Sequence, residues 1–288
     1  MQTDKNKISK QLKAVRSIMM DSLRETPISK LLPPGNNIMG SGKMLRAQLT
    51  LNLCQANGVE EKTGLHAAAA VEIIHGASLL HDDVIDGGVL RRNAPTFWKK
   101  HGINGTILLG DLLVFKGLNL LVQVERPDLL QELIDLSAQV CQSEVEQELL
   151  LRGTPGTWAE CEHIARAKTG SLFAFAAVAA ANESPKQIDA LREAGFILGT
   201  AYQLVDDILD DSGNEAVSGK TLGKDQERGK TTAITATKNA PADPVDYVVK
   251  LLAASSAQLN AWPSLKMAWD HFLDQTMRPT LETHLSAK

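Results

Sequence analysis

Two short stretches of the sequence carry closely spaced aspartates that could bind a metal ion. The first is "LLHDDVIDGGVLRR" and the second is "AYQLVDDILDD". Each has two aspartates four residues apart, Asp82 with Asp86 and Asp206 with Asp210. On a helix this spacing leaves the side chains about 40° apart in rotation and roughly 6 Å apart along the axis. Two unpaired anions there repel each other, and carboxylate oxygens suit Mg²⁺. A divalent cation between the aspartates is therefore a sharper candidate for the neutralising charge than the two arginines that end the first stretch.

Either aspartate cluster taken alone is more often a solvated acidic helix end. Each one, however, follows an apolar helical stretch, which predicts a place at the inner end of a helix and not on a polar face. Two such helices that face each other across a bundle would form an anionic cup, a known way for bundles to build metal sites. Mg²⁺ held in such a cup keeps some water ligands and binds substrate phosphates with its remaining positions.

Basic residues that could hold phosphate groups occur near both clusters and near a glycine-rich stretch, "GSGKMLR". Guanidinium groups bind phosphate oxygens in a bidentate manner, and glycines permit a close approach of the backbone. Any one of these residues alone could be a solvated surface charge, whereas the joint pattern predicts a site for a phosphorylated substrate. The candidates are Lys43, Arg46, Arg91, Arg92, Lys168 with Thr169, Lys220 and Lys230.

The elements that must position these residues are predicted to be helices almost everywhere. Segments such as "LHAAAAVEIIHGASLLHD" and "LLQELIDLSAQVCQSEVEQELLLR" are rich in good helix formers. Residues 171–181 are apolar on nearly all faces, which indicates a helix buried inside a large bundle. The fold class predicted is all-α, and no linker of domain-splitting length interrupts the 288 residues. One domain over residues 1–288 is therefore expected.

Composition excludes several other classes of protein. A net charge of −4 argues against binding to nucleic acid, which needs a basic surface. The three cysteines have neither metal-type spacing nor an even count, as expected in a reducing cytoplasm. The charged N-terminus has no apolar segment of the signal-peptide kind. Residues 107–124 are apolar but carry Asp111 and Lys116, which favours a buried helix over a transmembrane one.

From about Gly40 to Thr232, the chain resembles the trans-isoprenyl diphosphate synthases, the polyprenyl synthetase family. The resemblance rests on two DDxxD motifs in the family order, "DDVID" and "DDILD", and on the flanking "LLHDD", "LRRNAPT", "LLGD", "AKTGSLF" and "GKTLGKDQERGKTT". A single DDxxD is a weak signal, but this ordered set is specific. The closest likeness is to synthases of long-chain, octaprenyl-type products. The resemblance implies one helical bundle around a deep central apolar cavity, the type I isoprenoid synthase fold, in a homodimer.

The resemblance also implies roles for residues at the matching positions. Asp82, Asp86 and Asp206 would ligate three Mg²⁺ ions, with Asp83 supporting them and Asp210 completing the metal set. The catalytic group would comprise Asp82, Asp83, Asp86, Arg91, Lys168, Asp206, Asp207, Asp210, Lys220 and Lys230. The allylic diphosphate would contact Arg91, Lys168, Thr169, Gln203, Lys220 and Lys230. Isopentenyl diphosphate would contact Lys43, Arg46, His75 and Arg92.

The implied reaction fits these residue types. Cleavage of an allylic C–O bond creates a carbocation and a highly charged diphosphate, and Mg²⁺ with lysines and arginines stabilises that charge. The cation needs a dry pocket, the double bond of isopentenyl diphosphate attacks it, and loss of a proton to the released diphosphate completes one elongation. The family pattern "GGKRLRP" is "GSGKMLRA" here, so that Met44 replaces a basic residue and Ala47 a proline.

Two other functions share parts of this pattern. A class I terpene cyclase has the bundle and the first aspartate motif, but its second metal motif usually contains Asn, Ser and Glu, and it needs no second diphosphate site. A regulatory subunit tends to lose aspartates, whereas both motifs are whole here.

The length of the product is a separate question. Ala77 and Ser78 lie one turn before Asp82 and are too small to form a floor close to the metals, which favours a long-chain product over geranylgeranyl or farnesyl diphosphate. A deeper side chain such as Phe115 could close the pocket instead.

Overall fold

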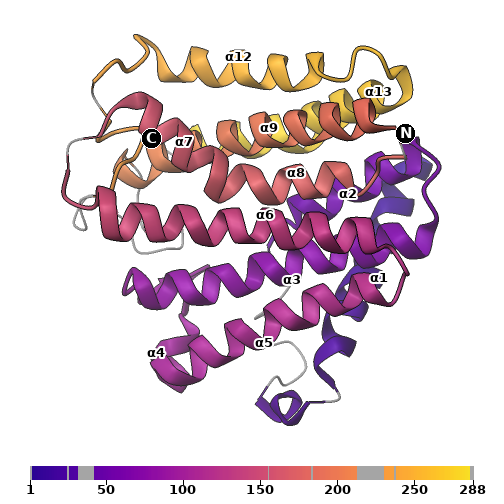
Figure 1. Ribbon diagram of the computed structural model, residues 1–288, viewed down its shortest axis with the longest axis horizontal. Helices are drawn as coiled ribbons and strands as arrows, with labels where there is room; N and C mark the ends of the chain where they lie inside the picture. The colour runs from indigo at the N-terminus through magenta and orange to yellow at the C-terminus, as the bar shows by residue number, and fades with distance from the viewer. Residues whose placement is uncertain are drawn as a thin grey trace.

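The computed structural model describes residues 2–24, 26–31, 42–154, 156–182, 184–212, 230–236 and 238–285. Long helices lie side by side in a bundle, seen from one side in Figure 1. The helices are α1 (Gln2–Arg24), α2 (Leu45–Ala56), α3 (Glu61–Ile85), α4 (Phe97–His101), α5 (Ile103–Val122), α6 (Pro127–Glu146), α7 (Trp158–Ala165), α8 (Ser171–Val178), α9 (Pro185–Ser212), α12 (Pro244–Ala257), α13 (Pro263–Phe272) and α14 (Arg278–Leu285). Short helical turns are η1 (Pro27–Leu31), η2 (Gln147–Leu151), η3 (Arg166–Gly170) and η4 (Leu273–Met277).

The all-α prediction is confirmed, with one small exception. Strands β1 (Leu90–Arg91) and β2 (Ala94–Pro95) pair antiparallel after α3. Arg92 and Asn93 connect them, and both have positive φ, 54° and 59°. Two consecutive left-handed residues in a two-residue loop are the geometry of a tight hairpin turn. The hairpin projects from the same end of α3 as the first aspartate motif.

The centre of the bundle is built from small residues that let helices approach closely. Every residue of α8 is buried, which confirms the prediction for this segment. Helix α9 lies against it at Gly195, where a Cβ atom would stand 2.4 Å from the Cα atom of Ala174. Gly199, one turn later, meets the backbone of Gly170 in the same way. This tight contact fixes α9 beside η3, and so fixes where the second aspartate motif emerges.

Helix α5 packs along α3 on one side only. Gly117 meets Ile74 of α3, and a Cβ atom there would stand 3.1 Å from the Ile74 side chain. By length and composition alone, α5 is long and apolar enough to cross a membrane, and 39% of the segment is buried inside the structure. The predicted burial of this segment therefore holds for one face, whereas the other face exposes large apolar side chains such as Leu108 and Phe115.

Candidate active site

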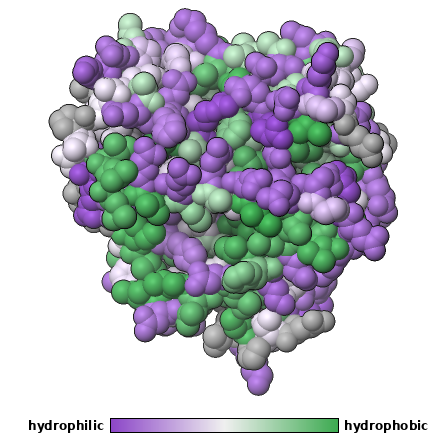
Figure 2. Space-filling model, in the orientation of Figure 1, coloured by the Kyte–Doolittle hydropathy of each residue, from purple (hydrophilic) through white to green (hydrophobic). Residues whose placement is uncertain are grey.

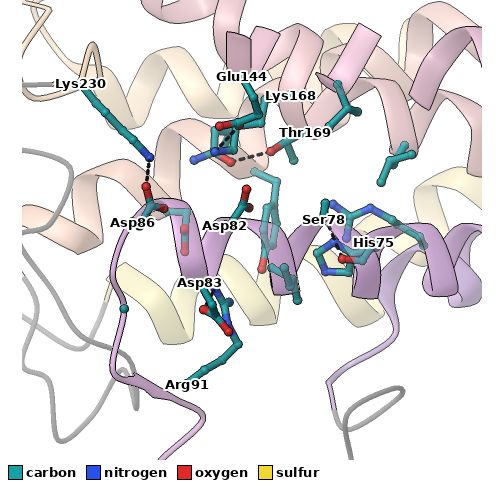
Figure 3. Close-up of a pocket in the computed structure, with 18 of the residues that line it drawn as sticks. His75, Ser78, Asp82, Asp83, Asp86, Arg91, Glu144, Lys168, Thr169 and Lys230 are labelled. Atoms are coloured by element: carbon teal, nitrogen blue, oxygen red, sulfur yellow. Dashed lines mark hydrogen bonds and ion pairs between the residues drawn. The ribbon is translucent and has the colours of Figure 1, made fainter. Parts of the chain in front are cut away.

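The first aspartate motif lies at the C-terminal end of α3. Helix α3 ends at Ile85 and Asp86 is its C-cap residue. Asp82 and Asp86 are partly buried, whereas Asp83 is buried with 5% exposure. Figure 3 shows the three side chains at this end of α3, with Asp82 directed toward the helices that carry Glu144 and Lys168. The predicted helical placement of the motif at an inner helix end is confirmed.

The hairpin after α3 brings Arg91 back to the motif. Arg91 Nε donates to Asp83 Oδ1 at 2.8 Å, and Arg91 Nη2 lies 2.7 Å from the same oxygen. Burial raises the pKa of Asp83, and the hydrogen bond and charge of Arg91 oppose that effect. Asp83 therefore holds the hairpin in place and is turned away from Asp82, as Figure 3 shows.

The second aspartate motif lies in the last two turns of α9, across the bundle from the first. Asp206 lines the same cavity as Asp82 and Asp86. Asp207 does not line this cavity: it accepts hydrogen bonds from Gln203 Nε2 at 2.7 Å and from the Ala233 N–H at 2.9 Å. The backbone of Asp210 belongs to α9, but its side chain lies outside the described residues, as does all of Lys220. Asp207 thus anchors residues 230–236, and the catalytic role expected for it stays a prediction.

Lysines from two other elements reach the carboxylates. Lys230 Nζ lies 2.6 Å from Asp86 Oδ1 and is 4% exposed. Lys168 pairs with Glu144 of α6. Although burial alone lowers the pKa of Lys168, the charges of Asp82 and Glu144 raise it above its ordinary value. Lys168 is therefore a cation at neutral pH, and each of the two lysines is held by a carboxylate beside the place expected for a metal-bound diphosphate.

The turn η3 positions Lys168 and its neighbour Thr169. It is a π-helical turn between α7 and α8, a local widening of the helix that is frequent at functional sites. Thr169 Oγ1 donates to Gln203 Oε1 at 2.5 Å, which ties η3 to α9. Gln203 is thus brought next to Lys168 and Thr169, although it lies more than 30 residues further along the chain.

A second group of cations lies further along α3, away from Asp86. His75 of α3 and Arg46 of α2 line the cavity together with Arg92 of the hairpin turn. The Arg46 guanidinium lies over the Phe173 ring, 4.7 Å from its centroid. Partial burial and the charges of Arg46, Arg91 and Arg92 hold the pKa of His75 well below its ordinary value of 6.5. His75 is therefore neutral at pH 7, and the positive charge of this region comes from the arginines.

These groups surround one cavity of about 310 Å³. Most of the predicted site residues line it: Arg46, His75, Ser78, Asp82, Asp83, Asp86, Arg91, Arg92, Lys168, Thr169, Gln203, Asp206 and Lys230. The aliphatic residues of the lining are Leu79, Leu90, Val140 and Leu172, and most of the other lining residues are polar. The deep apolar cavity that the family resemblance implies stays a prediction.

Four predicted residues lie elsewhere. Lys43 is exposed, Ala77 is buried in the core with 1% exposure, and Asp207 anchors the 230–236 segment. The suggestion that Phe115 closes the pocket is wrong for this chain, because Phe115 lies on the outward face of α5 with 68% exposure. Met44, which replaces a basic residue of the family pattern, is buried with φ of 50° and does not line the cavity.

The carboxylates that face the cavity fit Mg²⁺ by their chemistry. Asp82, Asp86 and Asp206 come from two elements, and oxygen ligands of this kind are those that Mg²⁺ prefers. Among the described side chains, no three acidic, histidine or cysteine groups already converge as a metal-binding set. The carboxylates repel one another, and Asp86 already forms an ion pair with Lys230. Ions bound here would therefore need water and substrate oxygens as additional ligands.

Two acidic residues of the site were missed by the sequence analysis. Glu144 lines the cavity, but it stands among other glutamates in "SEVEQE", and nothing in that pattern distinguishes it. Glu72 is a buried carboxylate of α3 behind Arg46. It stands alone in the apolar run "AAAAVEIIH", and a single charge inside such a helix was a usable signal.

Comparison with known proteins agrees with this geometry. A family model described as polyprenyl synthetase matches residues 29–260. An octaprenyl diphosphate synthase of Haemophilus influenzae is 34% identical over 198 residues, which cover 68% of this chain and 60% of that protein. A geranylgeranyl diphosphate synthase of Methanosarcina mazei is 34% identical over 201 residues, 67% of this chain and 62% of that protein. The matched part thus spans about three fifths of the length of these relatives.

Solved structures show the same fold. A polyprenyl synthase from Caulobacter crescentus CB15, complexed with calcium and isoprenyl diphosphate, superposes with a TM-score of 0.81 at 27% identity and covers 92% of this chain and 94% of its own. A decaprenyl diphosphate synthase from Rhodobacter capsulatus gives a TM-score of 0.74 at 25% identity, with 98% of both chains covered.

Proposed function

Because the chain belongs to the polyprenyl synthetase family, we propose that it is a prenyltransferase that condenses isopentenyl diphosphate with an allylic diphosphate. The product would be an all-trans polyprenyl diphosphate.

The observation that carries this proposal is the division of one cavity into two charged regions. At one end, carboxylates of α3 and α9 lie with Lys168 and Lys230. At the other end, Arg46 and Arg92 lie beside His75. A reaction that joins two diphosphate esters needs two anion sites close together, one of which must also promote departure of its diphosphate. The two regions supply these two kinds of site.

The carboxylate end would hold the allylic diphosphate. Asp82, Asp86 and Asp206, together with Asp210, would hold three Mg²⁺ ions that share the negative charge of the leaving diphosphate. Lys168 and Lys230 would each exchange a carboxylate partner for diphosphate oxygens, since both Nζ groups already stand at the cavity wall. Thr169 and Gln203 would orient the same group from η3 and α9, with Arg91 and Lys220 as further cations.

The arginine end would hold isopentenyl diphosphate. Arg46 and Arg92 offer guanidinium forks for diphosphate oxygens, and the neutral ring of His75 offers one hydrogen bond. The carbocation formed from the allylic substrate lies between the two ends, where Ser78, Leu79 and Leu172 line the cavity. The proton lost from the new chain would pass to the released diphosphate, since none of the chain's own groups is needed as the base.

A long-chain product is favoured over geranylgeranyl or farnesyl diphosphate. Ser78 lines the cavity one turn before Asp82 and is too small to block a growing chain there. Its hydroxyl donates to the His75 carbonyl at 2.9 Å, so the small side chain is folded back along α3. Relatives named for octaprenyl and for geranylgeranyl products match this chain about equally, so the preference rests on Ser78.

A homodimer would cover the exposed face of α5. This face carries large apolar side chains with 40% or more exposure: Ile103, Ile107, Leu108, Phe115 and Val122. Figure 2 shows apolar patches on the lower part of the same view, where α4 and α5 lie in Figure 1. A second copy related by a two-fold axis would present the same face and close the assembly.

Leu108→Glu should give monomers in light scattering, whereas Met267→Glu, an equally exposed position on α13, should not.

The cytoplasm is the expected compartment, since Cys54, Cys141 and Cys161 are all unpaired.

One assay tests the proposed function directly. Purified protein with Mg²⁺ would be incubated with isopentenyl diphosphate and allylic starters of increasing length, and the products would be sized by mass spectrometry. Elongation by five-carbon units supports the proposal, and a chain beyond twenty carbons supports the long-chain preference. Cyclisation of the allylic substrate alone, or no turnover with any starter, would contradict the proposal.

A further inference from the structure

Glu72 is a buried carboxylate placed directly behind the arginine end of the cavity. It lies on α3, one turn before His75, and is 7% exposed. Glu72 Oε1 accepts a hydrogen bond from the Ala47 N–H at 3.0 Å, in the first turn of α2. The backbone N–H of Arg46 also stabilises the carboxylate. Glu72 therefore connects α3 to the residue that carries one of the two cavity arginines.

A buried carboxylate is costly unless cations and hydrogen bonds compensate it. The charges of Arg46 and Arg92 both act on Glu72, and each opposes the effect of burial on the pKa of the carboxyl. The two arginines come from different elements, one from α2 and one from the hairpin turn. Without an anion between them, their guanidinium groups would repel each other.

The side chains around Glu72 are held by contacts within the protein. The Arg46 guanidinium is stacked on Phe173, and among the described residues its Nε atom has no hydrogen-bond partner. Met44, two residues earlier, adopts a left-handed conformation that costs roughly 1–2 kcal/mol for a residue with a Cβ atom. A buried donor without a partner and a strained turn indicate an anion site that is held ready by its surroundings.

We propose that Glu72 is a positioning residue for the second diphosphate site, which keeps Arg46 at the cavity and offsets the repulsion between Arg46 and Arg92. This inference rests on the proposed function, because it assumes that isopentenyl diphosphate binds at the arginine end. Glu72 itself does not line the cavity and acts through the arginines.

A simpler role for Glu72 would be to cap the first turn of α2. The Ala47 N–H is one of the donors that a helix start leaves without an internal partner. Two substitutions separate the roles. Glu72→Gln keeps an acceptor for this N–H and removes the charge. Ala47→Pro removes the N–H and keeps the charge, at a first-turn position where proline is tolerated and where the family pattern has proline.

The binding of isopentenyl diphosphate in the presence of EDTA isolates this end of the cavity, because the arginines need no metal ion to hold an anion. By titration calorimetry we expect Glu72→Gln to weaken this binding about tenfold, the loss typical of a charged hydrogen-bonding partner. Ala47→Pro should bind within about twofold of the unaltered protein. In steady-state assays with Mg²⁺, Glu72→Gln should raise KM for isopentenyl diphosphate and leave KM for the allylic substrate unchanged.

A matched control comes from a second carboxylate–arginine pair. Glu132 of α6 holds Arg192 of α9 through two contacts of 2.7 and 3.0 Å, remote from the cavity lining. Glu132→Gln makes the same chemical change and should lower Tm without altering either KM. If Glu72→Gln does not fold, Glu72→Asp keeps the charge on a shorter side chain, and its affinity should lie below that of the unaltered protein.

Three outcomes would overturn the inference. Tighter binding by Glu72→Gln would mean that Glu72 only lowers the positive potential of the site. A loss in Ala47→Pro as large as that in Glu72→Gln would mean that the helix cap is what matters. Unchanged binding by both Glu72 variants would exclude any role in the site. Failure of the unaltered protein to elongate an allylic substrate would instead count against the proposed function.

Discussion

The two ends of the cavity carry opposite charges, although both are proposed to bind the same kind of group. At the Asp86 end, carboxylates outnumber the cations that face them, and Lys230 and Lys168 are already paired with acids. At the His75 end, two arginines share a single buried carboxylate. Under the proposed function, a diphosphate would bind the second end directly, whereas at the first end it would need cations beyond those of the described residues. If the proposal holds, the dependence on metal ions would be confined to the end where the allylic C–O bond breaks.

The largest effect should come from removing a carboxylate of the first end. Asp82→Ala or Asp206→Ala should lower turnover ~10³-fold or more, because each removes a proposed ligand to ions that stabilise the leaving group. Isopentenyl diphosphate should still bind both variants in EDTA, and circular dichroism should show an intact helical fold. Asp128→Ala, at an exposed acid paired with Arg126, is the control. Near-normal turnover by either variant at ordinary Mg²⁺ would refute the metal assignment.

The two neighbouring arginines, Arg91 and Arg92, allow a finer test of the division of the cavity into a carboxylate end and an arginine end. Arg91 pairs with Asp83 near the carboxylate end, whereas Arg92 lies at the turn and faces Gly42. Lysine keeps the charge and loses the bidentate fork. Arg91→Lys should therefore raise KM for the allylic substrate, and Arg92→Lys should raise KM for isopentenyl diphosphate, each about tenfold. Equal effects of both variants on both substrates would leave only a shared positive region.

The residue between the two ends tests where the growing chain passes. Ser78 lines the cavity one turn from both His75 and Asp82. Ser78→Phe should shorten the product by at least one five-carbon unit, because the ring would fill the space beside the reacting carbon atoms. KM for the starter should change little, since the residues that bind diphosphate are untouched. If the Ser78→Phe variant made products of the same length as the wild-type protein, the long-chain interpretation would be contradicted. It would also be contradicted if the wild-type protein stopped at farnesyl diphosphate in the presence of excess isopentenyl diphosphate.

The smallest effect concerns the protonation of His75. In the folded protein the pKa of His75 lies well below 6.5. As pH falls, His75 is therefore protonated in the unfolded chain before it is protonated in the folded protein. The neutral ring therefore contributes stability that is complete above pH 6.5 and decreases below it, by at most ~1.4 kcal/mol per pH unit. Urea unfolding at pH 7.5 and 5.5 should show a smaller pH dependence for His75→Gln. An identical dependence in both proteins would mean that His75 is not held neutral by the arginine end.

Much of this site could be predicted from the sequence because its chemistry is local. Asp82 and Asp86 share a helix face by spacing alone, and the apolar run before them places that face inward. The same holds for Asp206, whose motif repeats the pattern on α9. The all-α fold follows from composition and period for the same reason, since neither depends on which helices meet.

What the sequence could not decide was which side chains meet across the bundle. Asp83 and Asp207 stand beside the ligand candidates in the two motifs, yet each accepts a hydrogen bond that holds another segment in place. Phe115 belongs to an apolar helix whose outward side only the packing of α3 against α5 reveals. Glu144 reaches Lys168 because α6 and η3 lie together. Spacing along one helix is set by 3.6 residues per turn, whereas contacts between helices are set by close packing at residues such as Gly195 and Gly199, which carry no reactive group themselves.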